Sequence, residues 1–189
     1  MVTDTRSPET PHALDLVIDF VNTLDIDADT DALSSADALT AWLAQAQVLS
    51  PATAAPTALE LRQAIDVREA LRALMLANNG ADGDARAVRE LELAARRGEL
   101  GVHFGEGGGV TLAPSAEGFA GAIARLLVPV AEAASDGSWQ RVKACRAENC
   151  QWAFYDRSRN RSGVWCEMAV CGNRTKVRAY RQRGTREQS

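Results

Sequence analysis

With 189 residues, 46% of them apolar, the chain is long enough for one medium-sized domain or for a larger domain with a small appendage. The first eleven residues are polar and do not resemble a signal peptide, and no uninterrupted apolar run approaches the roughly 20 residues that span a bilayer. We therefore expect a cytoplasmic protein without a membrane part.

The net charge of −4 hides a strong asymmetry along the chain. Residues 1–138 hold 9 Lys and Arg against 21 Asp and Glu, whereas residues 139–189 hold 12 Lys and Arg against 4 Asp and Glu. A basic C-terminal segment of this kind indicates a polyanionic partner such as nucleic acid. The alternative is that the two oppositely charged parts attract each other.

The first predicted element is a helix over residues 12–25. At the helical period its apolar residues cover one broad face. Asp15, Asp19 and Asn22 fall in a narrow stripe on the opposite side. The stripe is either a solvated face or, with Thr23, part of a small polar site for an effector, to which Asp19, Asn22 and Thr23 would contribute.

Further helices are predicted over residues 36–48, 59–78, 84–97 and 117–134. In the helix over 59–78, Arg68 and Arg72 lie beside the apolar stripe. Such arginines usually extend their charged ends to solvent, and a buried partner carboxylate, such as Asp19, is the alternative. Asp84 should cap the helix that follows, and Gly98 should end it.

Residues 100–114 alternate between apolar and polar side chains around a glycine-rich turn, which predicts a β-hairpin. Ser135–Ser138 reads as a linker, and the charge balance reverses there. The expected fold is mainly α with a small β-hairpin, in two domains: a helical domain over 1–138, able to fold alone, and a small finger over 139–189.

All four cysteines lie in that C-terminal segment, as Cys145-x4-Cys150 and Cys166-x4-Cys171. Four thiols confined to a short segment predict one tetrahedral Zn²⁺ site, because the spacing lies close to that of structural zinc sites. Both histidines are far away in sequence, so the four cysteines would complete the site and make it structural. The alternatives are two disulfides or four unrelated thiols.

Around the cysteines we expect a strand near Trp152–Tyr155, a polar loop over 157–163 and a helix over 173–183 with Asn173 as its N-cap. Cys171 would then lie just before a helix N-terminus, in an arrangement similar to a treble clef. The loop and helix carry the basic side chains expected to bind nucleic acid: Arg157, Arg159, Arg161, Arg174, Lys176, Arg178 and Arg181. A solvated charged face is the alternative.

The run Phe154-Tyr155-Asp156-Arg157-Ser158, followed by Val164-Trp165-Cys166 and by Cys171-Gly172-Asn173-Arg174, resembles the CGNR zinc finger. Leu16–Thr23 (LVIDFVNT) and Arg68–Arg72 resemble the ABATE domain, which precedes this finger in proteins described as stress-induced bacterial transcription regulators. The chain departs from the finger pattern at Gly163-Val164, where the resemblance implies two arginines.

Together these features predict a DNA-binding transcription regulator whose helical domain senses a small-molecule effector or forms a homodimer. The alternative is a zinc-stabilised module that binds RNA or an acidic protein. A third alternative is an enzyme or a thiol redox switch. No catalytic Ser-His-Asp or Cys-His set is evident, and the four-residue cysteine gaps differ from the usual redox motif.

Overall fold

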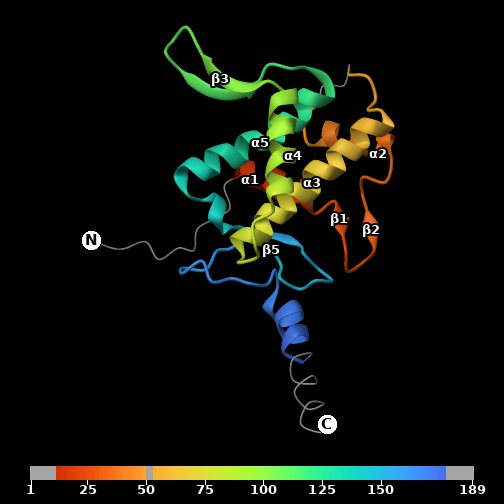
Figure 1. Cartoon of the computed structure of the whole chain (residues 1–189), viewed down its shortest axis with the longest axis vertical. Helices are drawn as coiled ribbons and strands as arrows, with labels where there is room; N and C mark the ends of the chain where they lie inside the picture. The colour runs from red at the N-terminus through yellow and green to blue at the C-terminus, as the bar shows by residue number, and fades with distance from the viewer. Residues whose placement is uncertain (1–11, 50–52, 178–189) are drawn as a thin grey trace, which may run out of the picture.

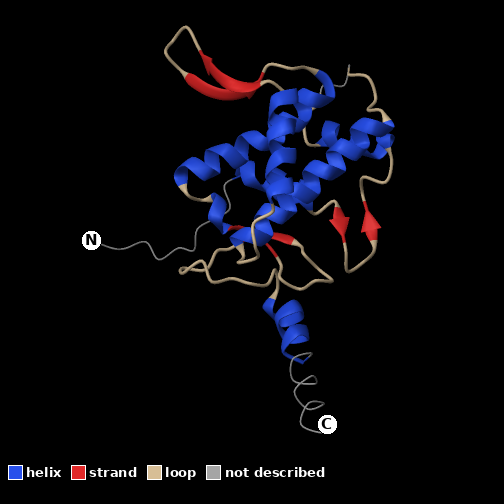
Figure 2. Cartoon of the chain, viewed as in Figure 1, coloured by secondary structure: helices blue, strands red, loops and turns tan. Residues whose placement is uncertain are grey.

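The computed structural model describes residues 12–49 and 53–177 and is mainly helical (Figures 1 and 2). The longer helices are α1 (His12–Val21), α2 (Ala36–Gln45), α3 (Ala58–Asn78), α4 (Ala85–Arg97) and α5 (Gly118–Asp136), and two short helical elements, η1 (Trp139–Arg141) and η2 (Met168–Gly172), follow them. Three antiparallel two-stranded sheets join β1 (Leu24–Asp25) to β2 (Thr30–Asp31), β3 (Leu100–Phe104) to β4 (Val110–Pro114), and β5 (Val142–Ala144) to β6 (Ala153–Tyr155). The expected class, mainly α with a hairpin near 100–114, is confirmed.

Local signals set several helix ends. Thr57 and Glu60 form a reciprocal capping box at the start of α3, which satisfies backbone N–H groups that have no partner within the helix. As predicted, the Asp84 side chain caps α4 by accepting two backbone hydrogen bonds, and the helix ends at Gly98. A Cβ atom at position 98 would lie 2.1 Å from the Cβ of Ala124, so glycine lets the end of α4 approach α5.

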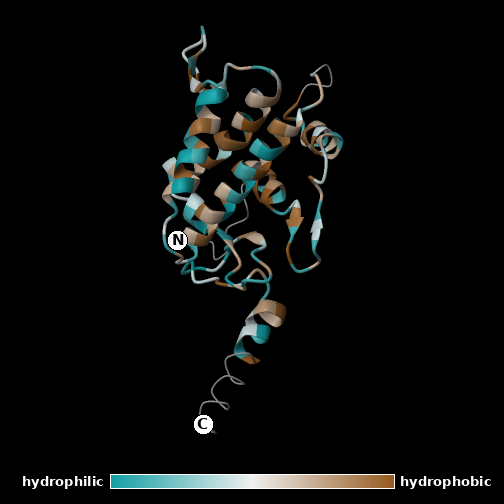
Figure 3. Cartoon of the chain, turned by 45° about the vertical axis from the view of Figure 1, so that its right-hand side comes forward, coloured by the Kyte–Doolittle hydropathy of each residue, from teal (hydrophilic) through white to brown (hydrophobic). Residues whose placement is uncertain are grey.

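The core lies where α1, α3 and α5 pack together, with fully buried Phe20, Leu71, Met75 and Leu126. Figure 3 shows brown, hydrophobic residues on these helices. By length and composition alone α5 could cross a membrane, but half of the stretch is buried inside the fold. Its Phe119, Ile123 and Leu126 belong to the core, which accounts for its apolar character.

Three expectations about the first 80 residues were wrong. The first helix ends at Val21, because the chain turns there into the β1–β2 hairpin, which the acidic segment did not suggest. Arg68 and Arg72 are each 2% exposed, so they do not reach solvent. Their carboxylate partner is not Asp19 either: Arg68 pairs with Asp31 and Glu69, and Arg72 with Glu69.

The segment after residue 138 shares the core of the helices. β5 lies across the end of α3 (Figure 1), and Val142, Ala144 and Ala153 belong to the same buried cluster as the helical residues. Asparagine side chains connect the two parts as well. Asn78 donates to the carbonyl groups of Trp139 and Val142, both at 2.9 Å.

A second asparagine, Asn79, donates to the carbonyl groups of Ala144 and Val164, both at 2.8 Å. Asn22 in turn exchanges two hydrogen bonds with the backbone of Ala153, of 2.7 and 3.0 Å. A boundary at residue 138 stays a prediction, but this shared core gives no support to the expectation that the first part folds alone.

Truncation after residue 138 should therefore destabilise the helical part. The fragment would lose the burial of Val142, Ala144 and Ala153 and leave Asn78 and Asn79 without their backbone acceptors, a cost of about 3–6 kcal/mol at usual magnitudes. Urea unfolding followed by circular dichroism measures the difference from the full chain. A fragment as stable as the full chain would show that the boundary separates two independent folding units.

Candidate metal centre

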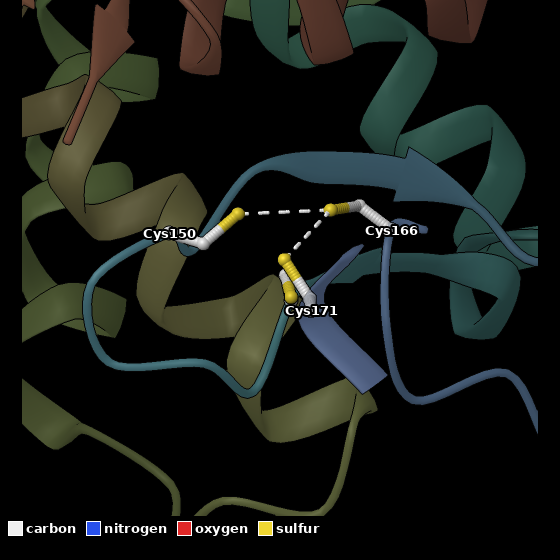
Figure 4. A group of neighbouring side chains, drawn as sticks. Cys150, Cys166 and Cys171 are labelled. Carbon is white, nitrogen blue, oxygen red and sulfur yellow. Dashed lines mark hydrogen bonds between the residues drawn. The ribbon is translucent and has the colours of Figure 1, made fainter. Parts of the chain in front are cut away.

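The four cysteine side chains converge on one point. Cys145 follows β5, Cys150 lies in the turn before β6, and Cys166 and Cys171 come from the segment beyond β6. All four Sγ atoms lie within 4.8 Å of one another; Cys150 to Cys166 is 3.6 Å and Cys166 to Cys171 is 3.8 Å (Figure 4). Zn–S bonds of about 2.3 Å in a tetrahedron place sulfurs about 3.8 Å apart, so the cluster fits Zn²⁺.

The same distances exclude the two alternatives weighed from the sequence. A disulfide needs sulfur atoms about 2.05 Å apart, and all four cysteines are free. Unrelated thiols would not meet at one point. Because four protein sulfurs complete the tetrahedron, no position is left for water or substrate, and the site is that of one structural Zn²⁺.

Short-range backbone hydrogen bonds preorganise the first cysteine pair. The N–H of Cys145 donates to the carbonyl of Trp152 at 2.9 Å and extends the β5–β6 pairing. The N–H of Cys150 donates to the carbonyl of Ala147 at 2.8 Å, which closes the turn. Gln151 then takes a left-handed conformation, with φ of 51°, and redirects the chain into β6.

The second pair is held by a helical turn that begins earlier than predicted. Asn173 is not its N-cap. The turn starts at Met168 after Glu167, includes Cys171 and continues as helix through residue 177. The N–H of Cys171 donates to the carbonyl of Glu167 at 2.9 Å. The expected knuckle, hairpin and ligand-bearing helical turn are present, and the likeness to a treble clef stays a prediction.

Each residue of the Cys-Gly-Asn-Arg motif has a structural role. Beyond the ligand Cys171, a Cβ atom at Gly172 would lie 2.3 Å from the Met168 sulfur and 3.1 Å from the Trp165 ring. The Asn173 side chain donates to the carbonyl of Ala169 at 3.0 Å. Arg174 forms an ion pair with Asp27 from the β1–β2 hairpin.

Burial and hydrogen bonding shift the pKa values of the free thiols in different directions. Burial raises the pKa of Cys166 well above its usual value and that of Cys171 to about 11. Burial also opposes ionisation of Cys145, but the backbone N–H groups of Cys166 and Ala147 outweigh it and lower the pKa of that thiol. Zn²⁺ must therefore displace protons from at least Cys166 and Cys171 when it binds.

A buried ion pair supports the finger beside the cysteines. Lys143 of β5 and Asp156 after β6 are 4% and 3% exposed, and their charged groups lie 2.7 Å apart. Burial alone would raise the pKa of Asp156, but hydrogen bonds from Lys143, Ser158 and Gly163 lower it to about 2. The resulting stabilisation is complete above the ordinary carboxyl pKa and is lost as the pH falls towards 2.

The same pair positions the arginine-bearing loop over 157–163. Lys143 also donates to the carbonyl groups of Arg161, at 2.6 Å, and Gly163, at 3.0 Å. A Cβ atom at position 163 would lie 2.7 Å from Oδ1 of Asp156. The departure from the finger pattern at Gly163 therefore falls where this loop packs against the buried carboxylate.

The described residues predicted to contact nucleic acid are all exposed. They are Arg157, Arg159, Arg161, Arg174 and Lys176. Arg161 donates to the Gln140 side chain at 2.6 Å, and Arg174 is bound by Asp27. Arg178 and Arg181 lie outside the described residues.

The three residues suggested for an effector site do not converge. Asn22 is bonded to Ala153, while buried Thr23 donates to the carbonyl of Phe20 and accepts a 3.2 Å hydrogen bond from Arg68. Asp19 is exposed beside a shallow cavity of about 480 Å³, and partial burial and the charge of Asp15 raise its pKa. An effector site there stays a prediction, with only Asp19 of the three facing that cavity.

Several residues that build the site were missed from the sequence. Lys143 looked like one more basic residue, and Asp156 was noted only as part of a motif. Asp27 lies 147 positions from Arg174 and 122 positions from Asn149, the two residues that donate to it, so local patterns could not reveal these contacts.

The family comparisons agree with this arrangement of a helical part and a cysteine cluster. Residues 14–137 match the ABATE family, described as "Putative stress-induced transcription regulator", and residues 141–184 match the CGNR zinc finger. No curated protein matches the chain. Because the first match alone covers more than half of the sequence, the chain belongs to the ABATE family, and its C-terminal segment is a CGNR zinc finger.

Proposed function

We propose that this protein is a transcription regulator that binds DNA through its basic, zinc-held C-terminal segment. The observation that carries the proposal is the exposure of basic side chains on the segment that also holds the closed metal site: Arg157, Arg159, Arg161, Arg174 and Lys176. A site with four protein ligands cannot take part in catalysis at the metal, but it can fix the surface that these side chains form.

The charge distribution supports a polyanionic partner. The C-terminal 51 residues hold 12 Lys and Arg against 4 Asp and Glu, and the four thiolates together with Zn²⁺ add only two negative charges, so the segment stays basic. The helical segment that begins at Met168 projects from the rest of the described chain (Figure 1), and its surface is hydrophobic in the first turn and hydrophilic further on (Figure 3). Such a helix can approach the phosphate backbone or a groove of duplex DNA.

In this proposal the protein is not an enzyme and works in the cytoplasm. The helical part senses a small-molecule effector or forms a homodimer. Because the finger shares its core with α3 and is hydrogen-bonded to Asn22, directly after α1, a change in the helices would be transmitted directly to the metal-bearing segment.

Duplex affinity should fall steeply with salt. If about five phosphates are neutralised, the slope of log K against log salt should be roughly −4 to −5. Arg159→Gln and Lys176→Gln should each reduce that slope by about one unit, because each removes one phosphate contact. Fluorescence anisotropy of a labelled duplex, titrated at several salt concentrations, measures both quantities.

The matched control is Arg89→Gln, which removes one exposed positive charge from α4 in the helical part and should leave the slope unchanged. A finger that is folded and zinc-loaded but shows no salt-dependent binding to duplexes of mixed sequence would contradict the proposal. Tighter binding to RNA of the same length would favour the RNA alternative, and binding to neither would favour an acidic protein partner.

A further inference from the structure

Asp27, an acidic residue of the helical part, already binds Arg174, one of the arginines of the proposed nucleic-acid surface. Arg174 donates from Nη1 to Oδ1 of Asp27 at 2.8 Å and from Nη2 to Oδ2 at 3.0 Å. The side-chain amide of Asn149, in the turn between Cys145 and Cys150, donates to the same Oδ1 at 3.2 Å. Three N–H donors from the finger therefore meet one carboxylate.

This arrangement has the geometry of phosphate recognition. A guanidinium binds two oxygens of a carboxylate or of a phosphodiester with the same pair of parallel N–H···O bonds. Asp27 presents two oxygens and one negative charge, as a backbone phosphate does. Both side chains are about half exposed, 42% for Arg174 and 47% for Asp27, so a phosphate from solution can reach the position once the carboxylate leaves.

The β1–β2 hairpin, which carries Asp27, is held firmly to the helical part at its base and weakly to the finger at its tip. At the base, Asp31 of β2 accepts hydrogen bonds of 2.7 and 3.0 Å from Arg68, which is 2% exposed. At the tip, Asp27 is held to the finger by exposed contacts alone, and exposed ion pairs contribute little stability. The hairpin can thus release the finger without disturbing the core.

We propose that Arg174 and Asn149 form a phosphate-binding position and that Asp27 fills it from within the same chain, so that the β1–β2 hairpin competes with nucleic acid for the finger. This inference rests on the proposed function, since it concerns the same surface. It adds Asn149 as a phosphate contact and gives the helical part a direct means of lowering affinity for nucleic acid.

The test compares Asp27→Asn with Asp29→Asn by anisotropy of a labelled duplex. Both substitutions remove one negative charge from the same turn with little change of shape, and Asn tolerates the left-handed backbone of Asp29, whose φ is 54°. Within the described ranges, no hydrogen bond joins Asp29 to Arg174. We expect Asp27→Asn to tighten binding about three- to tenfold and Asp29→Asn by less than about twofold.

The Arg174→Ala variant shows whether the tighter binding expected of Asp27→Asn comes from the release of Arg174. In that background Asp27→Asn should no longer tighten binding, because the arginine that it releases is absent. If the wild type binds DNA but Asp27→Asn and Asp29→Asn behave alike, or the gain persists without Arg174, the inference is overturned while the proposed function stands. If no folded, zinc-loaded variant binds duplex, both are overturned.

Discussion

Replacing Cys145 by Ser is expected to remove the zinc ion and unfold the C-terminal segment. Cys145 is fully buried, and a serine hydroxyl is a poor substitute for a thiolate ligand of Zn²⁺. Metal binding supplies most of the folding free energy of small zinc modules, about 10–16 kcal/mol in isolated fingers, so losing one ligand should cost several kcal/mol. Because Val142, Ala144 and Ala153 lie in the common core, the helical part should lose stability too.

Two measurements on the same preparation test this expectation: zinc per chain by elemental analysis and thermal unfolding by circular dichroism. The control is Ala147→Ser, which places the same hydroxyl at a buried position beside the cluster and leaves all four ligands in place. That variant should keep its zinc. A Cys145→Ser protein with a full equivalent of zinc and an unchanged midpoint would contradict the assignment of the ligands.

The second large effect is expected from Lys143→Met. The substitution keeps the length of the side chain but leaves the Asp156 carboxylate, 3% exposed, without its counter-charge. Breaking a buried pair in this way usually costs about 3–5 kcal/mol, because an uncompensated charge stays in the interior. The carbonyl groups of Arg161 and Gly163 would also lose a donor.

Urea unfolding measures the cost, and the double variant Lys143→Met/Asp156→Asn provides the comparison. Removing both charges should restore part of the lost stability, since no isolated charge stays buried. The zinc content should be unchanged in both proteins, because neither residue is a ligand. A single variant as stable as the wild type would show that water reaches Asp156 and that the pair does not hold the arginine-bearing loop.

Features set by short-range signals could be predicted from the sequence. Cysteine spacing identified the metal ligands, because two close pairs of cysteines can supply all four ligands of a tetrahedral site without a residue from elsewhere in the chain. The capping residue Asp84 and the alternating pattern of residues 100–114 located a helix start and a hairpin for the same reason.

Features that depend on distant partners could not be predicted. Arg68 and Arg72 looked like surface-reaching arginines. Apart from Glu69 on the same helix, the groups that bind them belong to other segments: Asp31 and the carbonyls of Val21 and Gln151. β5 was missed because Lys143 at its centre resembles a surface residue, although Asp156 makes its burial possible.

The sequence did not reveal the contacts that join the helical part to the C-terminal segment. Net charge reflects mainly the surface residues of a segment. The contacts between the two parts are made instead by buried apolar residues and by asparagine side chains. Asn78 and Asn79 lie at the end of α3, where the sequence shows an ordinary helix C-terminus. Their amide groups are the donors that dock β5 and the loop near Val164.

Every step from this fold to the proposed function depends on one metal ion, and native mass spectrometry tests it most directly. The full chain, purified without added metal, should carry one zinc ion, and denaturation in acid should release it and leave four reduced cysteines. Alkylation after denaturation counts those thiols. A metal-free protein whose mass is about 4 Da lower than that of the reduced chain would show two disulfides instead and contradict the account at its centre.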